Sequence, residues 1–302
     1  MKTMKSKFYS LALAAGMLSL TACSDDNTND SNNDKGNGIE NGSTLKGTIT
    51  EDVTLKAGNT YKLSGEYIVE AGATLNIEEG VKIISVYDNI VDYILVKQGA
   101  KINAVGTPDK PIVMTSEKEE PGAWGGIHIC GKAHTNAEGG KGSSEIGGAV
   151  YGGNDDADNS GTLQYIRLEY TGFAFDEEHE ANGISFYGVG NGTIVDHCEA
   201  YKGSDDGFEF FGGSVNVSNM VVVSCSDDSF DWTEGWNGKG TDLVAYQEAK
   251  ATLGYDCDCL IEADNNENDN AATPVSHPVL KNLILAGNGE SKQGIRLRRG
   301  TQ

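Results

Sequence analysis

A motif that recurs after 22 residues most constrains the fold of this chain. Residues 203–213 read GSDDGFEFFGG, and residues 225–235 read CSDDSFDWTEG. Both copies contain Ser-Asp-Asp and a small residue, followed by an aromatic, an acidic and an aromatic residue. A repeat of this length, rich in glycine and in strand-forming residues, predicts a solenoid in which one repeat makes one coil.

Related segments extend the pattern on both sides of this motif. Its second half recurs at 183–188 and 294–300. A second type of strand, with alternating apolar residues, lies around and between these copies, at 162–168, 193–198, 214–222 and 278–285. Looser units between residues 45 and 116 combine a glycine turn with alternating apolar residues. Short alternating strands between Gly, Asn and Asp turns, with no helical period, predict β structure throughout.

The N-terminus predicts export. Three lysines precede an apolar run in residues 1–22, as in a signal peptide, and the run is too short to span a bilayer. Leu-Thr-Ala-Cys at 20–23 resembles a bacterial lipobox, which implies that Cys23 is lipidated and becomes the new N-terminus. Ordinary signal cleavage beside an incidental cysteine is the alternative.

The residues after Cys23 bear on where the protein resides. Ser24 does not resemble the inner-membrane retention signal of Gram-negative lipoproteins, which implies a lipid-anchored position at the outer membrane or cell surface. Residues 23–43, rich in Ser, Asp, Asn and Gly, predict a disordered acidic tether. The folded domain is then expected at 44–302.

The chain is strongly acidic, with a formal net charge of −22 over 302 residues. Such a surface repels nucleic acid and attracts cations, Ca²⁺ included. We therefore expect no nucleic-acid partner. The simpler interpretation of this charge is that it keeps an exported protein soluble.

Several of these features together carry a family resemblance. The glycine turns, the Trp-Gly-Gly-Ile strand at 124–127 and the Asp-Asp-Gly-Phe unit at 205–208 resemble the right-handed parallel β-helix, or pectate-lyase-like, superfamily and, within it, surface β-helix lipoproteins without known activity. The resemblance implies an all-β fold, a single-stranded right-handed parallel β-helix solenoid. It implies little about activity, because this fold carries lyases, hydrolases, adhesins and scaffolds. Since no capping segment follows the last unit, we expect a C-terminally truncated solenoid or a partner that caps it.

The repeated Asp pairs are the main candidate site. Equivalent positions of successive coils stack about 4.8 Å apart, which would place like charges over one another. Such a ladder needs a bound cation, raised pKa values or solvated side chains. We predict a Ca²⁺ site and, beside it, a glycan-binding face of outward-facing acids; the residues are Asp205, Asp206, Asp227 and Asp228 for the cation and Glu209 and Asp231 for the ligand. The alternative is that the Asp pairs only stabilise turns.

Catalysis is the competing hypothesis. The Asp pair at 205–206 faintly resembles the motif of polygalacturonase-like glycoside hydrolases, but their Gly-His-Gly turn is absent, and His277 lies in Ser-His-Pro. A Ca²⁺-dependent lyase would need a Lys or Arg base opposite an acidic cluster, and no motif selects Lys202 or Arg167 for that role. The sequence thus favours binding of a polysaccharide or another surface component without catalysis, over a polysaccharide lyase, a glycoside hydrolase or a structural stalk. Exposed aromatics flanked by Arg or Lys would favour the enzyme.

Two further expectations concern loops and cysteines. The polar segments 131–161 and 264–270 are predicted to leave the coil as long loops, where binding residues often lie. Five cysteines follow Cys23, an odd number that cannot pair completely, and their spacing does not fit a zinc site. We expect them to be buried as small apolar residues: Cys130, Cys198, Cys225, Cys257 and Cys259.

Overall fold

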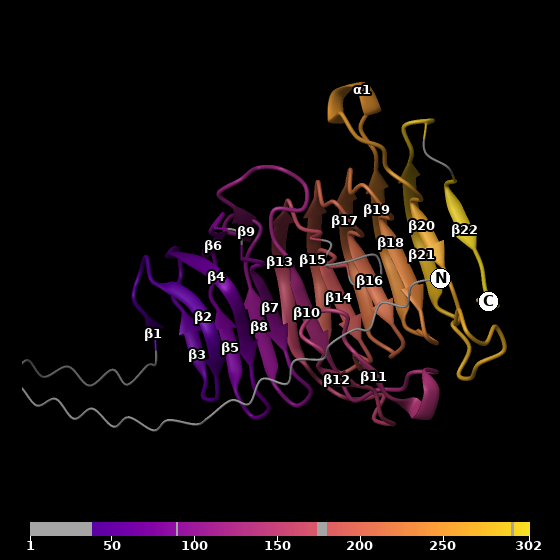
Figure 1. The fold of residues 1–302 in the computed structure, drawn as a ribbon, viewed down its shortest axis with the longest axis horizontal. Coiled ribbons are helices and arrows are strands. Elements are labelled where there is room, and N and C mark those ends of the chain that lie inside the picture. The colour runs from indigo at the N-terminus through magenta and orange to yellow at the C-terminus, as the bar shows by residue number, and fades with distance from the viewer. Residues whose placement is uncertain (1–37, 89, 174–179, 291–292) are drawn as a thin grey trace, which may run out of the picture. The chain divides into compact units, whose positions relative to one another are not determined.

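Parallel strands dominate the fold, as the 22-residue repeat predicts (Figure 1). The computed structural model describes residues 38–88, 90–173, 180–290 and 293–302. Twenty of the described strands form one sheet whose pairings are parallel. This arrangement confirms the predicted parallel β-helix solenoid.

One column of strands, column 1, carries the repeated motif. Phe208 pairs with Phe230 and Glu209 with Asp231, which confirms the offset read from the sequence. The strands of column 1 are β2 (Thr44–Ile49), β4 (Thr60–Val69), β7 (Tyr93–Val96), β10 (Ile127–Cys130), β14 (Ile184–Tyr187), β16 (Phe208–Phe211), β18 (Phe230–Thr233), β20 (Ile261–Ala263) and β22 (Ile295–Leu297).

The second strand type forms column 2. Its members are β1 (Gly38–Ile39), β3 (Val53–Leu55), β5 (Thr74–Ile77), β8 (Lys101–Val105), β13 (Gly161–Glu169), β15 (Ile194–Tyr201), β17 (Asn216–Val223), β19 (Lys239–Tyr246) and β21 (Val279–Ala286). A shorter run, β6 (Lys82–Ser85) and β9 (Ile112–Ser116), pairs between β4 and the second half of β13.

The long strands of column 2 bend at one left-handed residue in each coil. These residues align from coil to coil and have φ between 51° and 58°: Tyr165, His197, Asn219, Asp242 and Asn282. Asn, Asp and His tolerate this conformation better than most residues do. His197, Asn219 and Asn282 thus lie at equivalent bends of the coil.

Aromatic rings fill the interior beside column 1. Phe208 stacks on Phe230 with ring centroids 5.9 Å apart. Phe210 lies between Phe186, at 5.1 Å, and Trp236, at 4.2 Å. Alternation along a strand sends every second side chain inward, so these rings stack because their positions are in register. The aromatic positions of the repeated motif therefore form a stacked core.

Residues 131–161 leave the stacked strands between β10 and β13, as predicted, but they pack on the coil instead of extending into solvent. This segment contains η1 (Glu138–Gly140), β11 (Gly142–Ser143) and β12 (Val150–Tyr151), and it folds back over the outer face of column 1. Ile146 and Tyr151 are buried there against Tyr187 and Phe211. A few apolar residues suffice, because the strands beneath them present apolar side chains outward. The one α-helix in the described ranges, α1 (Lys250–Leu253), lies at the opposite edge (Figure 1).

The two ends of the coil differ from its middle. β1 pairs with β3, so strand pairing starts before residue 44, and the predicted signal peptide, Cys23 and most of the predicted tether lie outside the described residues. None of the described helices is long and apolar enough to cross a membrane. In the last coil Ile295 and Leu297 are 51% and 65% exposed, although their partners Ile261 and Ala263 are buried.

Truncation of a central ring tests the aromatic core. We expect Phe210→Ala to lower the free energy of unfolding by about 3–5 kcal/mol, because it leaves a cavity between two stacked rings. Tyr246→Ala, at a side chain that is 48% exposed, is the control and should change it by about 0.5 kcal/mol or less. Urea unfolding measures both, and equal effects would contradict the described packing.

Candidate functional site

A row of polar side chains crosses the outer face of column 1. Ser185, Glu209 and Asp231 pair from β14 to β16 to β18, and the row continues through Glu262 of β20 to Arg296 of β22. Each member follows an inward-facing residue, so strand alternation turns it away from the core. We call this set the polar row. It places the two predicted ligand-binding acids, Glu209 and Asp231, side by side.

The Ser-Asp-Asp turns lie directly before these strands and are joined by hydrogen bonds. The backbone N–H of Asp228 donates to Oδ1 of Asp206, at 2.8 Å, and that of Cys259 donates to Oδ1 of Asp228, at 2.5 Å. Asp205 accepts from the N–H of Asp206 at 3.0 Å. These hydrogen bonds agree with the alternative prediction that the Asp pairs stabilise turns. Each carboxylate still has oxygen lone pairs that are free to bind a ligand.

Carboxylates of the turns and of the polar row converge. One oxygen each from Asp206, Glu209 and Asp231 lies within 4.8 Å of the other two. Asp205 and Asp206 are buried and form a second such group with the exposed Asp227. Both groups offer only oxygen, as Ca²⁺ requires. A third group contains Asp228, Glu262 and the Cys259 thiol, a set that suits a softer ion than Ca²⁺.

Burial and mutual repulsion disfavour the charged forms of these acids. Burial raises the pKa of Asp206 and of Asp231 well above the usual range, and neighbouring carboxylates raise it further. Burial likewise raises the pKa of Glu209, although its hydrogen bond from Asn182 Nδ2, at 2.6 Å, acts in the opposite direction. For Asp228, burial with the charges of Asp227 and Glu262 raises the pKa to about 8.

A pocket of about 350 Å³ opens beside the polar row. Glu209 and Asp231 contribute to one wall, and the segment 131–161 supplies another through Glu145 and Tyr151. The Tyr151 hydroxyl donates to Oε2 of Glu234 at 2.7 Å, which fixes that segment to the coil. No feature of the sequence indicated that Glu145 and Tyr151 would reach the pocket.

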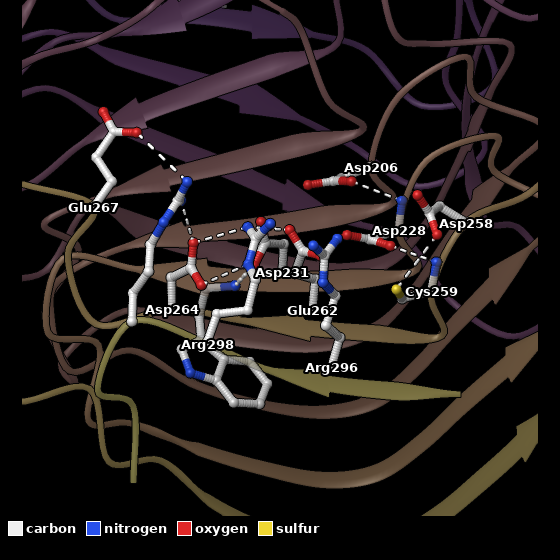
Figure 2. A network of polar contacts seen from close by, with 12 residues as sticks. Asp206, Asp228, Asp231, Asp258, Cys259, Glu262, Asp264, Glu267, Arg296 and Arg298 are labelled. Atoms are coloured by element: carbon white, nitrogen blue, oxygen red, sulfur yellow. Dashed lines mark hydrogen bonds and ion pairs between the residues drawn. The ribbon is translucent and has the colours of Figure 1, made fainter. Parts of the chain in front are cut away.

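Arg298 and Arg299 also line the pocket, and Figure 2 shows Arg298 beside Asp264 and Glu262. Arg298 binds Asp264 through two hydrogen bonds of 2.8 Å, and Arg299 binds the same carboxylate at 2.6 Å. Arg298 also pairs with Glu262, as does Arg296. These cations balance the acids of the last two coils. The sequence placed Arg296, Arg298 and Arg299 only within the copy of the repeat at 294–300, without their partners.

The other catalytic candidates lie outside this pocket. Arg167 is paired with Glu169 and Glu199, and Lys202 is paired with Glu248, at 3.0 Å. His277 is not among the residues that line the pocket. His179 lies outside the described residues. The expectation of buried cysteines is confirmed for all five: Cys130, Cys198, Cys225, Cys257 and Cys259.

Comparison with known proteins identifies a family. A family model described as a pectate-lyase-like β-helix domain matches residues 47–302, which is most of the chain. No curated protein matches the sequence. The match covers every strand of the described coil from β3 onward.

The raised pKa values predict that stability falls with rising pH in cation-free buffer. Unfolded Asp and Glu titrate near pH 4, whereas folded Asp228 titrates at about 8 and Asp206, Glu209 and Asp231 well above their usual range. Between these values the folded state binds more protons. The free energy of unfolding should therefore drop by on the order of 1 kcal/mol or more from pH 6.5 to pH 8.5.

Urea unfolding in EDTA-containing buffers between pH 6.5 and pH 8.5 measures how the free energy of unfolding changes with pH. The buried His128, whose pKa is lowered to about 4, is neutral in the folded state over this range, whereas an unfolded histidine titrates near 6.5. Its contribution therefore opposes the fall, by less than about 0.5 kcal/mol, and ends near pH 7.5. Asp228→Asn should flatten the dependence. A free energy of unfolding that rises with pH in the wild-type protein would contradict the charges assigned to the row.

Proposed function

Because the chain belongs to the pectate-lyase-like β-helix family, we propose that it is a lipid-anchored surface protein that binds a polysaccharide or another surface component without transforming it. The ligand occupies the pocket beside the polar row. Ca²⁺ bound to the adjacent carboxylates reinforces the site. The predicted lipid on Cys23 holds the domain at the outer membrane, with residues 24–37 as the tether.

The convergence of Asp206, Glu209 and Asp231 carries the cation part of this proposal. Two unit charges 4.8 Å apart repel by about 3–4 kcal/mol at an effective dielectric of 20. Three such pairs in a partly buried site are incompatible with full ionisation unless a cation or protons compensate. The arginines are engaged one coil away, with Glu262 and Asp264, so a divalent cation is the simplest compensation at neutral pH.

The pocket lining supports a ligand rich in hydroxyl groups. Carboxylates accept hydrogen bonds from hydroxyls, while the guanidinium groups of Arg298 and Arg299 and the amide of Asn268 can donate to them. The aromatic residues that line the pocket are buried rather than presented as an exposed platform. This mixture matches a carbohydrate better than an apolar molecule.

A glycoside hydrolase or polysaccharide lyase remains the second candidate, and one observation favours it. The pocket places two acids that resist ionisation, Glu209 and Asp231, near Asp264, whose carboxylate is bound by two arginines. Neighbouring acids in opposed environments are the arrangement that divides general-acid and general-base roles. An enzyme of this fold was expected to combine exposed aromatic residues with flanking Arg or Lys. The pocket has the arginines, but its aromatic residues are buried.

Thermal unfolding with Ca²⁺ or EDTA tests the cation site. At a hundredfold excess over the dissociation constant, Ca²⁺ should stabilise the folded protein by about 2.7 kcal/mol, a rise in midpoint of about 5–10 °C for a domain of this size. Asp231→Asn should abolish the rise. Asp109→Asn, at an exposed turn, is the matched control and should keep it. A thermal unfolding midpoint of the wild-type protein that is the same with Ca²⁺ and with EDTA would overturn the cation site.

Incubation with a panel of polysaccharides separates the binder from the enzyme. For a binder, we expect retention on an immobilised glycan that Glu209→Gln weakens at least tenfold, with no release of reducing ends. For a hydrolase, reducing ends would appear and Asp231→Asn would suppress them by at least a hundredfold, as loss of a general acid does. Release of reducing ends by the wild-type protein would reject the non-catalytic proposal.

A further inference from the structure

The segment 131–161 and the loop 264–270 both line the pocket, and they contact each other through side-chain amides. Asn266 Nδ2 donates to Oδ1 of Asn136 at 2.9 Å, and Asn136 Nδ2 donates to Oδ1 of Asn265, also at 2.9 Å. Asn136 and Asn265 are buried. Because each amide can both donate and accept, these bonds fix the position of one segment relative to the other.

A second cavity, of about 440 Å³, is lined by both segments, and we call it the loop cavity. Three residues line both this cavity and the pocket: Glu234, Asn266 and Asn268. The two cavities therefore adjoin. Each lies near the lower end of the range of about 300–1,000 Å³ that is typical of ligand pockets. A ligand that fills both is consequently longer than one that fills the pocket alone.

The wall that the two cavities share presents polar atoms to a ligand. Glu234 Oε2 accepts hydrogen bonds from Thr135 Oγ1 and from the Tyr151 hydroxyl, both at 2.7 Å, and these bonds orient the carboxylate. Among the described residues, neither Glu234 Oε1 nor the side-chain amide of Asn268 has a hydrogen-bond partner. A hydroxyl group of a ligand can donate to the first and can bond to either end of the second.

The charges around the loop cavity select against an anionic ligand. Its acids are Glu138, Glu234 and Asp269, and no lysine or arginine is among its lining residues. None of the three groups in the described ranges that could hold an ion includes these acids, so the proposed Ca²⁺ would not compensate them. They would repel a chain of uronic acids. An ammonium group cannot accept a hydrogen bond from Asn268 or Arg298, whereas a hydroxyl can.

We propose that the pocket and the loop cavity form one groove for an uncharged oligosaccharide, from which chains of uronic acids are excluded. The inference rests on the proposed function, because it names the ligand class of the same pocket. One end of the saccharide lies beside the polar row, its middle contacts Glu234 and Asn268, and its other end lies in the loop cavity. Its hydroxyls donate to the carboxylates and accept from the amides and guanidinium groups.

Calorimetric titration with uncharged probes of increasing length, in Ca²⁺ and again in EDTA, tests the groove. The probes are cello-, xylo- and manno-oligosaccharides from the disaccharide to the hexasaccharide. In at least one series the hexamer should bind about tenfold more tightly than the dimer, or better, because only the hexamer reaches the loop cavity. Ala272→Trp, which fills that cavity, should remove this gain and leave binding of the dimer unchanged. Ala251→Trp, in the exposed helix α1, is the matched control and should retain the gain.

A charge reversal tests the ligand class. A galacturonate hexamer should bind about tenfold more weakly than the uncharged hexamer, or worse. Glu138→Lys, at an exposed position of the loop cavity, should narrow this difference. Asp109→Lys makes the same change of net charge at an exposed turn outside both cavities and should not narrow it. Asn268→Ala, at an exposed side chain, should weaken binding of the uncharged hexamer, which keeps the test valid if Ala272→Trp folds poorly.

The outcomes separate the groove from the proposed function. Equal affinities of dimer and hexamer in every series would overturn the groove and leave the proposed function, which needs the pocket alone. Tighter binding of the galacturonate hexamer, or of a glucosamine hexamer, than of every uncharged hexamer would overturn the ligand class. Absence of binding by every probe would reject the groove together with carbohydrate binding.

Discussion

Stacking of equivalent residues at about 4.8 Å is the constraint on which this structure depends. Inside the coil it places aromatic rings over one another, as for Phe208 and Phe230, and the apolar contact stabilises the fold. On the outer face the same spacing places Glu209 beside Asp231, where like charges repel. One register therefore produces both the most favourable and the least favourable contacts of the motif.

Backbone hydrogen bonds and arginine ion pairs offset part of this repulsion. Backbone N–H groups of the next coil reach the carboxylates of Asp206 and Asp228, so each of these two acids also joins two coils. Farther along, Arg298 binds Asp264 and pairs with Glu262. Between these two solutions Glu209 and Asp231 form no ion pair with a residue of the described ranges, and that imbalance marks the site.

Much of this arrangement follows from the sequence, because a repeat specifies register. The 22-residue offset alone predicts that Phe210 faces the core and that Glu209 lies beside Asp231. It could not predict that the segment 131–161 covers them, since Ile146 and Tyr151 form no periodic pattern. Contacts that join an irregular loop to a regular coil depend on tertiary packing, which local patterns do not encode.

The covering segment changes the chemistry of the row. Outward-facing acids on an open sheet would be solvated, and water would screen their repulsion. In the pocket that Tyr151 and Tyr187 also line, Glu209 and Asp231 are half-buried and close together, which favours removal of their charges by protonation or their compensation by a cation. A binding site and a catalytic site make opposite use of this condition: the first holds a cation that keeps the acids ionised, and the second keeps one acid protonated beside an ionised partner. The charge state of Asp231 in the liganded protein therefore separates the two functions more directly than the fold does.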